Sequence, residues 1–261
     1  MIHFVDLGDD KKWAELCGSI YEAQLPLMVE LLHSFPSFGG KILEIGCSTG
    51  QVTEYLGQNC REVYALDSSP TMLYQARRRI EHDLGLENVT FQELKNFSVL
   101  PELNKKFDQI FILNSSFTAI TDVQDQKHYL TNAYNALDKG GRLIVCTDMM
   151  KVDTILRDPS SSYHLIEVPN FNGVGRINVS EQVDYDEFSQ LCETLIVADF
   201  VGDDGLVTER FQKKIVSRYT HIFEMVHLLK LSGFTMDGVY GDVYGEPLSD
   251  NTDKVIWVAR R

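Results

Sequence analysis

Apolar residues along the chain fall into two alternating patterns: short continuous runs and longer segments with helical spacing. The short runs are apolar at successive positions, as in strands that are buried on both faces. They lie at 41–45, 62–66, 88–92, 107–113 and 142–146. The segments with helical spacing lie between them, at 51–60, 70–82 and 125–137. Strands that alternate with helices predict a parallel sheet with helices on both faces.

The pattern changes after residue 150. Stretches that favour β structure, separated by turn residues, fill 163–220, and the pair 193–201 and 206–216 predicts an antiparallel hairpin. A helix at 221–231 and strands near 238–242 and 254–259 follow. We therefore predict an α/β fold, with a doubly wound, mostly parallel seven-stranded sheet and an antiparallel β insertion. The expected parts are an N-terminal helical cover (1–38), a ligand-binding core (39–150), the β-rich insertion (151–220) and a C-terminal helix with the last two strands (221–261).

Composition is that of an ordinary globular protein and narrows the possible partners. Of 261 residues, 44% are hydrophobic and 24% are charged, close to the globular average. The 24 basic and 38 acidic residues give a net charge of −14, and such a surface repels nucleic-acid phosphates and anionic lipids. No apolar run reaches the ~18 residues of a membrane span. We expect no nucleic-acid partner, no membrane partner and no signal peptide.

The cysteines bear on the compartment of the protein. Their number is odd and their spacing fits no metal site, so we expect reduced thiols, no bound metal and a cytoplasmic location. The five are Cys17, Cys47, Cys60, Cys146 and Cys192.

The turn after the first strand of the predicted sheet is rich in small residues. It runs from Glu44 to Gly50 and leads into a helix. Small residues let the backbone approach a ligand closely, and the first amides of a helix can hold an anionic group. Asp67 ends the next strand, 17 residues after Gly50, where a carboxylate can accept two hydrogen bonds from a ribose diol. In an open parallel sheet, ligands bind at this edge.

Glu-x-Gly-x-Ser-x-Gly from Glu44 to Gly50, with Asp67 after the next strand, resembles the class I S-adenosylmethionine-dependent methyltransferases. Ser48 stands where that family most often has glycine. The resemblance covers nearly the whole chain and includes features of a bacterial subgroup that acts on small molecules. Its further segments are Trp13 with Tyr21, Glu93-Leu94, Asn114-Ser115-Ser116-Phe117, Leu137-Asp138-Lys139-Gly140-Gly141, and the stretches 233–234 and 240–245.

The resemblance implies a Rossmann-like methyltransferase fold, S-adenosylmethionine as the cofactor and a substrate cap formed by the insertion. It places the methionine part of the cofactor on Gly46, Ser48 and Gly50, and the ribose on Asp67. Met72 packs on adenine in this interpretation, or else belongs to the core. The full set of implied cofactor-binding residues is Glu44, Gly46, Cys47, Ser48, Gly50, Asp67, Ser68, Met72, Glu93, Leu94 and Asn114.

Methyl transfer is an in-line displacement, so the protein mainly aligns the acceptor, and a base is needed only when the acceptor must lose a proton. Each candidate side chain for this role also has a plainer interpretation, as a surface or packing residue. The catalytic candidates are Tyr21, His164, Arg218 and His221, with Arg176 and Tyr219 as further possibilities.

Other functions fit the sequence less well. A dehydrogenase would need Gly-x-Gly-x-x-Gly, which the loop does not supply. A nucleic-acid methyltransferase would carry prolines after Asn114, and a metal-dependent enzyme would need more acids than Asp148 at the strand ends. The prediction is therefore methyl transfer to a small-molecule acceptor, at nitrogen or oxygen, by a monomer or homodimer. The alternative is a non-catalytic regulatory protein that binds S-adenosylmethionine or S-adenosylhomocysteine.

Overall fold

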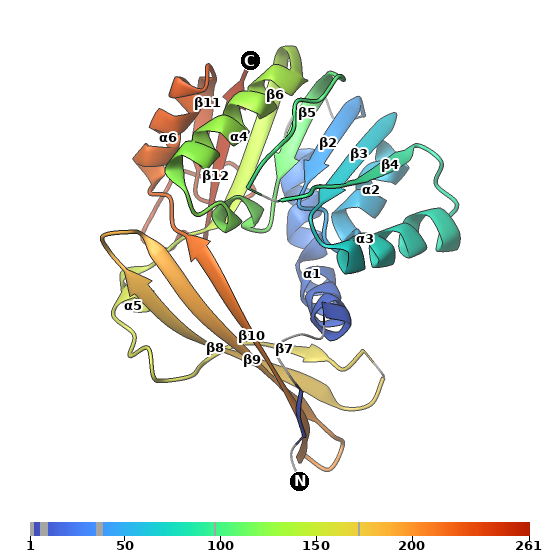
Figure 1. Cartoon of the computed structure of the whole chain (residues 1–261), viewed down its shortest axis with the longest axis vertical. Helices are drawn as coiled ribbons and strands as arrows, with labels where there is room; N and C mark the ends of the chain where they lie inside the picture. Colours follow the sequence, from blue (N-terminus) through green and yellow to red (C-terminus); the bar gives the residue numbers. More distant parts are fainter. Residues whose placement is uncertain (1–2, 6–9, 35–38, 97, 172) are drawn as a thin grey trace. The chain divides into compact units, whose positions relative to one another are not determined.

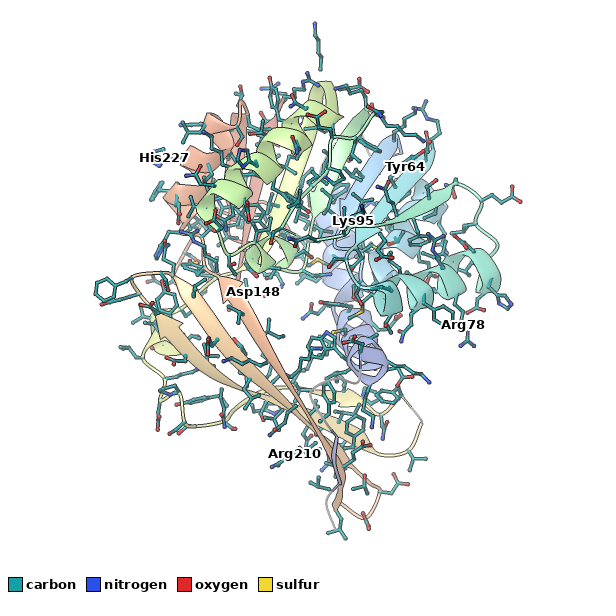
Figure 2. The ribbon with its side chains drawn as sticks, in the orientation of Figure 1. Tyr64, Arg78, Lys95, Asp148, Arg210 and His227 are labelled. Carbon is teal, nitrogen blue, oxygen red and sulfur yellow. The ribbon has the colours of Figure 1, made fainter. Side chains whose placement is uncertain are left out.

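The computed structural model describes residues 3–5, 10–34, 39–96, 98–171 and 173–261. Figure 1 traces the chain and Figure 2 adds the described side chains. The chain forms two compact units. The larger consists of Gln24–Met149 and Thr220–Arg261, and the smaller of Met1–Ala23 and Met150–Tyr219.

The larger unit is built on a seven-stranded sheet with the order β11-β12-β6-β5-β2-β3-β4 (Figure 1). Neighbours from β6 to β4 pair in parallel, whereas β12 pairs antiparallel with both β6 and β11. The predicted seven-stranded, mostly parallel sheet is thus confirmed. Its strands are β2 (Lys41–Ile45), β3 (Glu62–Asp67), β4 (Val89–Glu93), β5 (Phe107–Ile112), β6 (Leu137–Asp148), β11 (Thr235–Tyr240) and β12 (Lys254–Arg260).

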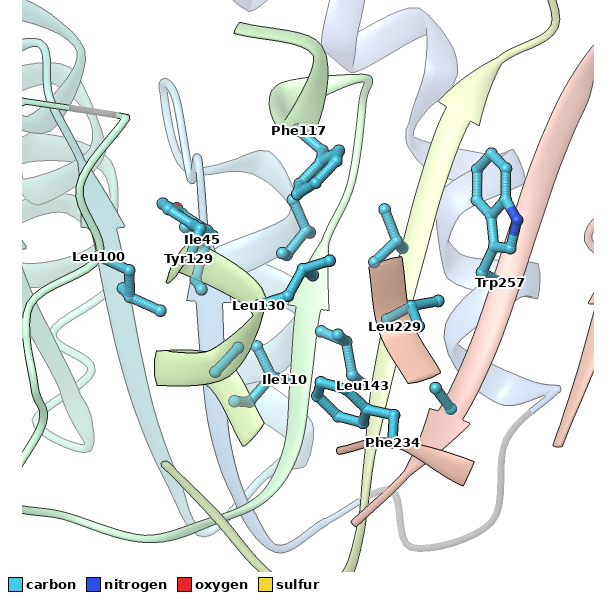
Figure 3. Close-up of a cluster of buried hydrophobic side chains, with 14 of the residues drawn as sticks. Ile45, Leu100, Ile110, Phe117, Tyr129, Leu130, Leu143, Leu229, Phe234 and Trp257 are labelled. Carbon is cyan, nitrogen blue, oxygen red and sulfur yellow. The ribbon is translucent and has the colours of Figure 1, made fainter. Parts of the chain in front are cut away.

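Helices cover both faces of this sheet, as the continuous apolar strands require. On one face, α4 (Val123–Ala136) and α6 (Ile222–Leu231) bury Tyr129, Leu229 and their neighbours against the strands, with Trp257 of β12 in the same cluster (Figure 3). On the other face, α2 (Gln51–Asn59), α3 (Pro70–Arg77) and the second half of α1 (Asp10–His33) pack through residues such as Leu31 and Leu56.

Local interactions explain where several helices begin and end. Ser69 caps α3 by accepting a hydrogen bond from the Met72 amide. Asp122 caps α4, which therefore begins at Val123 rather than at 125 as the sequence predicted. The helix expected to continue to residue 82 changes to π-helical turns after Arg77, at Arg78–Asp83.

The segment 138–141, which lies between a predicted helix and a predicted strand, forms the start of β6. Gly140, with φ of 79°, donates its amide to the Arg261 carbonyl. The Arg261 amide donates in turn to the Gly141 carbonyl. The sequence prediction missed this strand extension because its partner lies more than a hundred residues away.

The smaller unit is built on a five-stranded sheet with the order β1-β10-β9-β8-β7. Strands β7 to β10 are antiparallel, and the predicted hairpin is β9 with β10, which confirms it. The short β1 pairs in parallel with β10 and was not predicted. The elements are β1 (His3–Val5), α5 (Val152–Ile155), β7 (Tyr163–Pro169), β8 (Arg176–Asp186), β9 (Leu191–Val201) and β10 (Val207–Arg218).

The first half of α1 belongs with this five-stranded sheet. Leu16 is fully buried in a cluster with Phe200 and Phe211, and the ring of Trp13 stacks on that of Phe211 with centroids 6.3 Å apart. The residues expected to form an N-terminal cover at 1–38 are therefore divided between the two units.

Candidate functional site

The loop after β2 lies where the order of the sheet reverses, because β2 pairs with β3 on one side and with β5 on the other. Its backbone is left-handed at Gly46 (φ 81°), Ser48 (φ 49°) and Gly50 (φ 88°). A Cβ on Gly50 would lie 2.9 Å from the Cβ of Ala76, so only glycine lets this loop approach α3 without displacing it. The amides of Gly46 and Cys47 donate to the Leu66 carbonyl over 2.8 and 3.0 Å.

Asp67 joins this loop to the end of β3. Its Oδ2 accepts a hydrogen bond from the Ser48 amide (2.8 Å), and its Oδ1 accepts one from the Ser69 amide (2.9 Å). Burial raises the pKa of Asp67, and the amide hydrogen bonds from Ser69, Ser48 and Ser68 partly offset that rise. A carboxylate has about four lone-pair positions, so these three amide bonds leave Asp67 able to accept one more.

Glu44 lies beneath the same loop, fully enclosed by protein. The Thr53 hydroxyl donates to its Oε2 over 2.6 Å. Burial raises the pKa of Glu44 to about 8, the Thr53 hydrogen bond opposes the rise, and the charge of Asp67 adds to it. Glu44 therefore holds a proton at neutral pH, and a cationic ligand nearby would favour its release.

The other predicted cofactor residues gather around Asp67. The Ser48 hydroxyl contacts the sulfur of buried Met72 at 3.4 Å. The Leu94 amide donates to the Asp67 carbonyl over 2.8 Å, and Glu93 pairs in register with Asp67 and is exposed. Cys47 is buried, and burial raises the pKa of its thiol. The structure thus brings these residues together at one edge of the sheet.

Asn114, which follows β5, carries an unsatisfied polar atom at the same edge. Its Oδ1 is buried and accepts no hydrogen bond within the described part of the chain. The backbone is left-handed at both Asn114 (φ 51°) and Ser115 (φ 59°), which costs about 1–3 kcal/mol per residue and is typical of functional sites. A ligand with a hydrogen-bond donor would satisfy this oxygen, so the residues present fit a polar cofactor.

Residues 42–141, which contain this loop, Asp67 and Asn114, match a family described as the methyltransferase domain. This part of the chain is therefore similar to the methyltransferase domain family. S-adenosylmethionine is the cofactor of this family.

Curated relatives match part of the chain at low sequence identity. A protein of Saccharolobus solfataricus, named probable cobalt-precorrin-6B C(15)-methyltransferase (decarboxylating), is 29% identical over 120 residues, which are 45% of this chain and 56% of that protein. The chain therefore spans about half the length of this curated relative.

Two solved structures extend the comparison to the whole chain. An S-adenosylmethionine-dependent methyltransferase from Clostridium acetobutylicum has a TM-score of 0.70 at 21% identity, covering 98% of this chain and 92% of that one. CalS10, a cofactor-bound amino pentose methyltransferase from Micromonospora echinaspora, has a TM-score of 0.69 at 16% identity, covering 99% and 100%. At such identities the likeness shows the fold alone.

The catalytic candidates divide between the two units. Tyr21, His164 and Arg218 belong to the smaller one. His164 is exposed on edge strand β7, and Arg218 is buried and donates to Gln190 Oε1 over 2.6 Å. His221 lies in the larger unit, where it caps α6 together with Glu224. These contacts give Arg218 and His221 structural roles, and the catalytic role of all four stays a prediction.

The two further candidates also have structural contacts. Arg176 forms an ion pair with Glu167 at 3.1 Å. Tyr219 is buried in the smaller unit, and its amide donates to the Gln190 carbonyl over 2.9 Å. A role for either residue in positioning an acceptor stays a prediction.

One polar cluster in the larger unit was missed by the sequence prediction. Ser115, Asp148 and Lys254 meet at the ends of β5, β6 and β12. From the sequence, Asp148 was weighed only as a possible metal ligand. The signal that could have found the cluster is the shared sheet edge: parallel β5 and β6 end where antiparallel β12 begins.

Proposed function

We propose that this methyltransferase transfers the methyl group of S-adenosylmethionine to a nitrogen or oxygen atom of a small-molecule acceptor. The main support for the proposal is a pair of hydrogen-bond acceptors at the ends of the two strands that flank β2. Asp67 ends β3 with a lone-pair position to spare, and Asn114 follows β5 with a buried Oδ1 that accepts no hydrogen bond among the described residues. Between them lies a loop whose small residues allow close approach of a ligand.

Each residue has a distinct part in this proposal. Asp67 accepts hydrogen bonds from the ribose hydroxyls, and the loop from Gly46 to Gly50 lies against the methionine part. Asn114 Oδ1 accepts a bond from the amino group of the cofactor. Glu44, relieved of its proton, balances the positive charge. When bound, the cofactor supplies an electrophilic methyl group on a positively charged sulfur.

A small acceptor is supported by charge and by the named relatives. The net charge of −14 disfavours binding to nucleic acid. The relatives described above are named for a precorrin and an amino pentose. Positioning alone can supply ~7–11 kcal/mol of the barrier reduction, so the chain needs no fixed triad of catalytic side chains.

Label transfer tests this proposal. The protein is incubated with methyl-labelled S-adenosylmethionine and a metabolite extract, and label is counted in small-molecule, protein and nucleic-acid fractions. We expect label in the small-molecule fraction and none there with the Asp67→Ala variant. Label in a macromolecular fraction would contradict the acceptor class. Cofactor binding without transfer to any fraction would favour the non-catalytic regulatory protein instead.

A further inference from the structure

Ser115, Asp148 and Lys254 form a connected polar cluster that the cofactor site does not use. The Ser115 hydroxyl donates to Asp148 Oδ2 over 2.7 Å and accepts from the Asp148 amide over 2.9 Å. Lys254 Nζ donates to Asp148 Oδ1 over 2.7 Å. Both carboxylate oxygens are therefore held in place, each with a lone pair to spare. In Figure 2, Asp148 is labelled at the carboxyl end of β6.

The two charged members of the cluster differ sharply in exposure. The Lys254 side chain is 14% exposed and that of Asp148 is 67% exposed. Burial lowers the pKa of Lys254, but the charge of Asp148 and its hydrogen bond outweigh burial and raise it overall. The lysine thus stays charged beneath the carboxylate, which faces outward. In a fully solvated surface ion pair, worth about 0–1 kcal/mol, both partners are exposed, whereas this lysine is largely covered.

The backbone around Ser115 is also unusual. Asn114 and Ser115 are successive left-handed residues without being glycine. The Ser115 amide donates to the Cys146 carbonyl over 3.2 Å, which fixes the turn against β6. The strain of this turn therefore places two side chains: Asn114 with its buried Oδ1, and Ser115 with its hydroxyl on Asp148.

Strand order places the cluster next to the cofactor site. Asp67 ends β3, the glycine loop follows β2, Asn114 follows β5, and Asp148 ends β6. Neighbouring strands are about 4.8 Å apart, so Asp148 lies one strand beyond Asn114 and on the opposite side of the loop from Asp67. A ligand with its ribose on Asp67 and its methionine part on the loop would leave the edge at β5 and β6 for an acceptor.

We propose that Asp148 binds the methyl acceptor, and that the acceptor is a small amine. This inference rests on the proposed function. An N–H of the amine donates to the outward lone pairs of the Asp148 carboxylate, while Ser115 and Lys254 hold that carboxylate in position. An alcohol would need a base to take its proton, and a carboxylate already paired with lysine is a weak one. A neutral amine needs only to be oriented, because its nitrogen lone pair forms the bond to the methyl carbon as the carbon–sulfur bond breaks, and the methylated ammonium can then release a proton to water. The ammonium form of the free amine is attracted by the exposed negative charge and loses one proton to water before it reacts.

Binding to the complex with S-adenosylhomocysteine tests this without any turnover. The saturated protein is titrated in a calorimeter with glucosamine, tyramine and putrescine, and with glucose, tyrosol and butanediol as their hydroxyl counterparts. We expect at least one amine to bind about tenfold or more tightly than its counterpart, because its ammonium group pairs with the carboxylate by both charge and hydrogen bond, whereas a hydroxyl supplies the hydrogen bond alone. Saturated protein that binds none of the amines, or binds an alcohol equally well, would overturn the proposal.

Variants link the binding to Asp148. Asp148→Asn should weaken amine binding about tenfold or more and leave S-adenosylhomocysteine affinity unchanged. Asp148→Asn removes the carboxylate that pairs with the largely covered Lys254 ammonium. The double variant Asp148→Asn/Lys254→Met avoids this by making the cluster neutral, and the same loss of amine binding is expected. The matched control is Asp237→Asn, which removes an aspartate of the same sheet that pairs with Arg142 at 3.1 Å.

The outcomes separate this inference from the proposed function. Wild-type amine affinity in both Asp148 variants would overturn the acceptor role while the cofactor site stands. An equal loss in Asp237→Asn would also overturn it, because the effect would then follow any lost ion pair of the sheet. If the wild-type protein does not bind S-adenosylhomocysteine, the proposed function is wrong, and this inference is wrong with it.

Discussion

The Ser48 amide donates a hydrogen bond of 2.8 Å to Asp67 Oδ2, across 19 residues of chain. This bond ties the loop after β2 to the end of β3, so one side chain both shapes the loop and offers its remaining lone-pair position at the sheet edge. Loop shape and ribose binding are therefore coupled through Asp67.

Replacing Asp67 should weaken cofactor binding more than it affects folding. In Asp67→Asn, an NH2 group faces an amide donor and the negative charge is lost. Hydrogen bonds to charged groups are worth about 1.5–3 kcal/mol, so we expect S-adenosylmethionine affinity to fall at least about tenfold, measured by equilibrium dialysis.

The matched control for Asp67 is Asp122→Asn. Asp122 Oδ1 also accepts bonds from two backbone amides, those of Gln124 and Asp125, but at the start of α4. Its cofactor affinity should equal that of the parent. Equal affinities for all three proteins would contradict the role given to Asp67.

Glu44 should make the protein less stable as pH rises. The pKa of Glu44 is about 8 in the folded protein against an ordinary 4.5, so between these values the folded state holds a proton that the unfolded state has lost. Stability then falls with increasing pH, by up to about 4–5 kcal/mol at about 1.4 kcal/mol per unit. Glu44→Gln should remove this loss.

Urea unfolding at pH 5 and pH 8 checks the prediction for Glu44. The difference between the two free energies of unfolding should be smaller in Glu44→Gln than in the parent, whereas Glu87→Gln, at an exposed position, should behave as the parent. An identical pH dependence in Glu44→Gln and the parent would show that Glu44 is ionised in the folded protein.

Gly50 should tolerate no side chain because of its contact with α3. Gly50→Ala incurs a left-handed backbone cost of about 1–2 kcal/mol and a Cβ contact of 2.9 Å with Ala76. Gly85→Ala incurs only the backbone cost, because Gly85 is left-handed with open space around it. Overpacking costs about 1–3 kcal/mol, so Gly50→Ala should be the less stable by that amount in chemical denaturation. Equal stabilities would contradict the packing account of the loop.

The sequence sufficed for the elements whose signals are local. Continuous apolar runs predicted β2 and β5 because parallel strands are buried on both faces, and the small residues at 46–50 predicted a close-approach turn. Asp67 could be singled out because an acid directly after a buried strand is rarely needed for packing.

The features that the sequence did not predict depend on distant partners. β1 has three residues and exists as a strand only beside β10. The extension of β6 through Gly140 depends on Arg261. The proposed role of Asp148 in binding the methyl acceptor depends on its contact with Lys254, which lies more than a hundred residues away in the sequence.

Calorimetric titration of the purified protein with S-adenosylmethionine, S-adenosylhomocysteine and NADH tests the central claim most directly. The account predicts that the first two bind at a single site and that NADH does not, since the loop lacks the glycine pattern of a dinucleotide site. Absence of binding by both S-adenosyl compounds would contradict the assignment of the loop from Gly46 to Gly50 as a cofactor site.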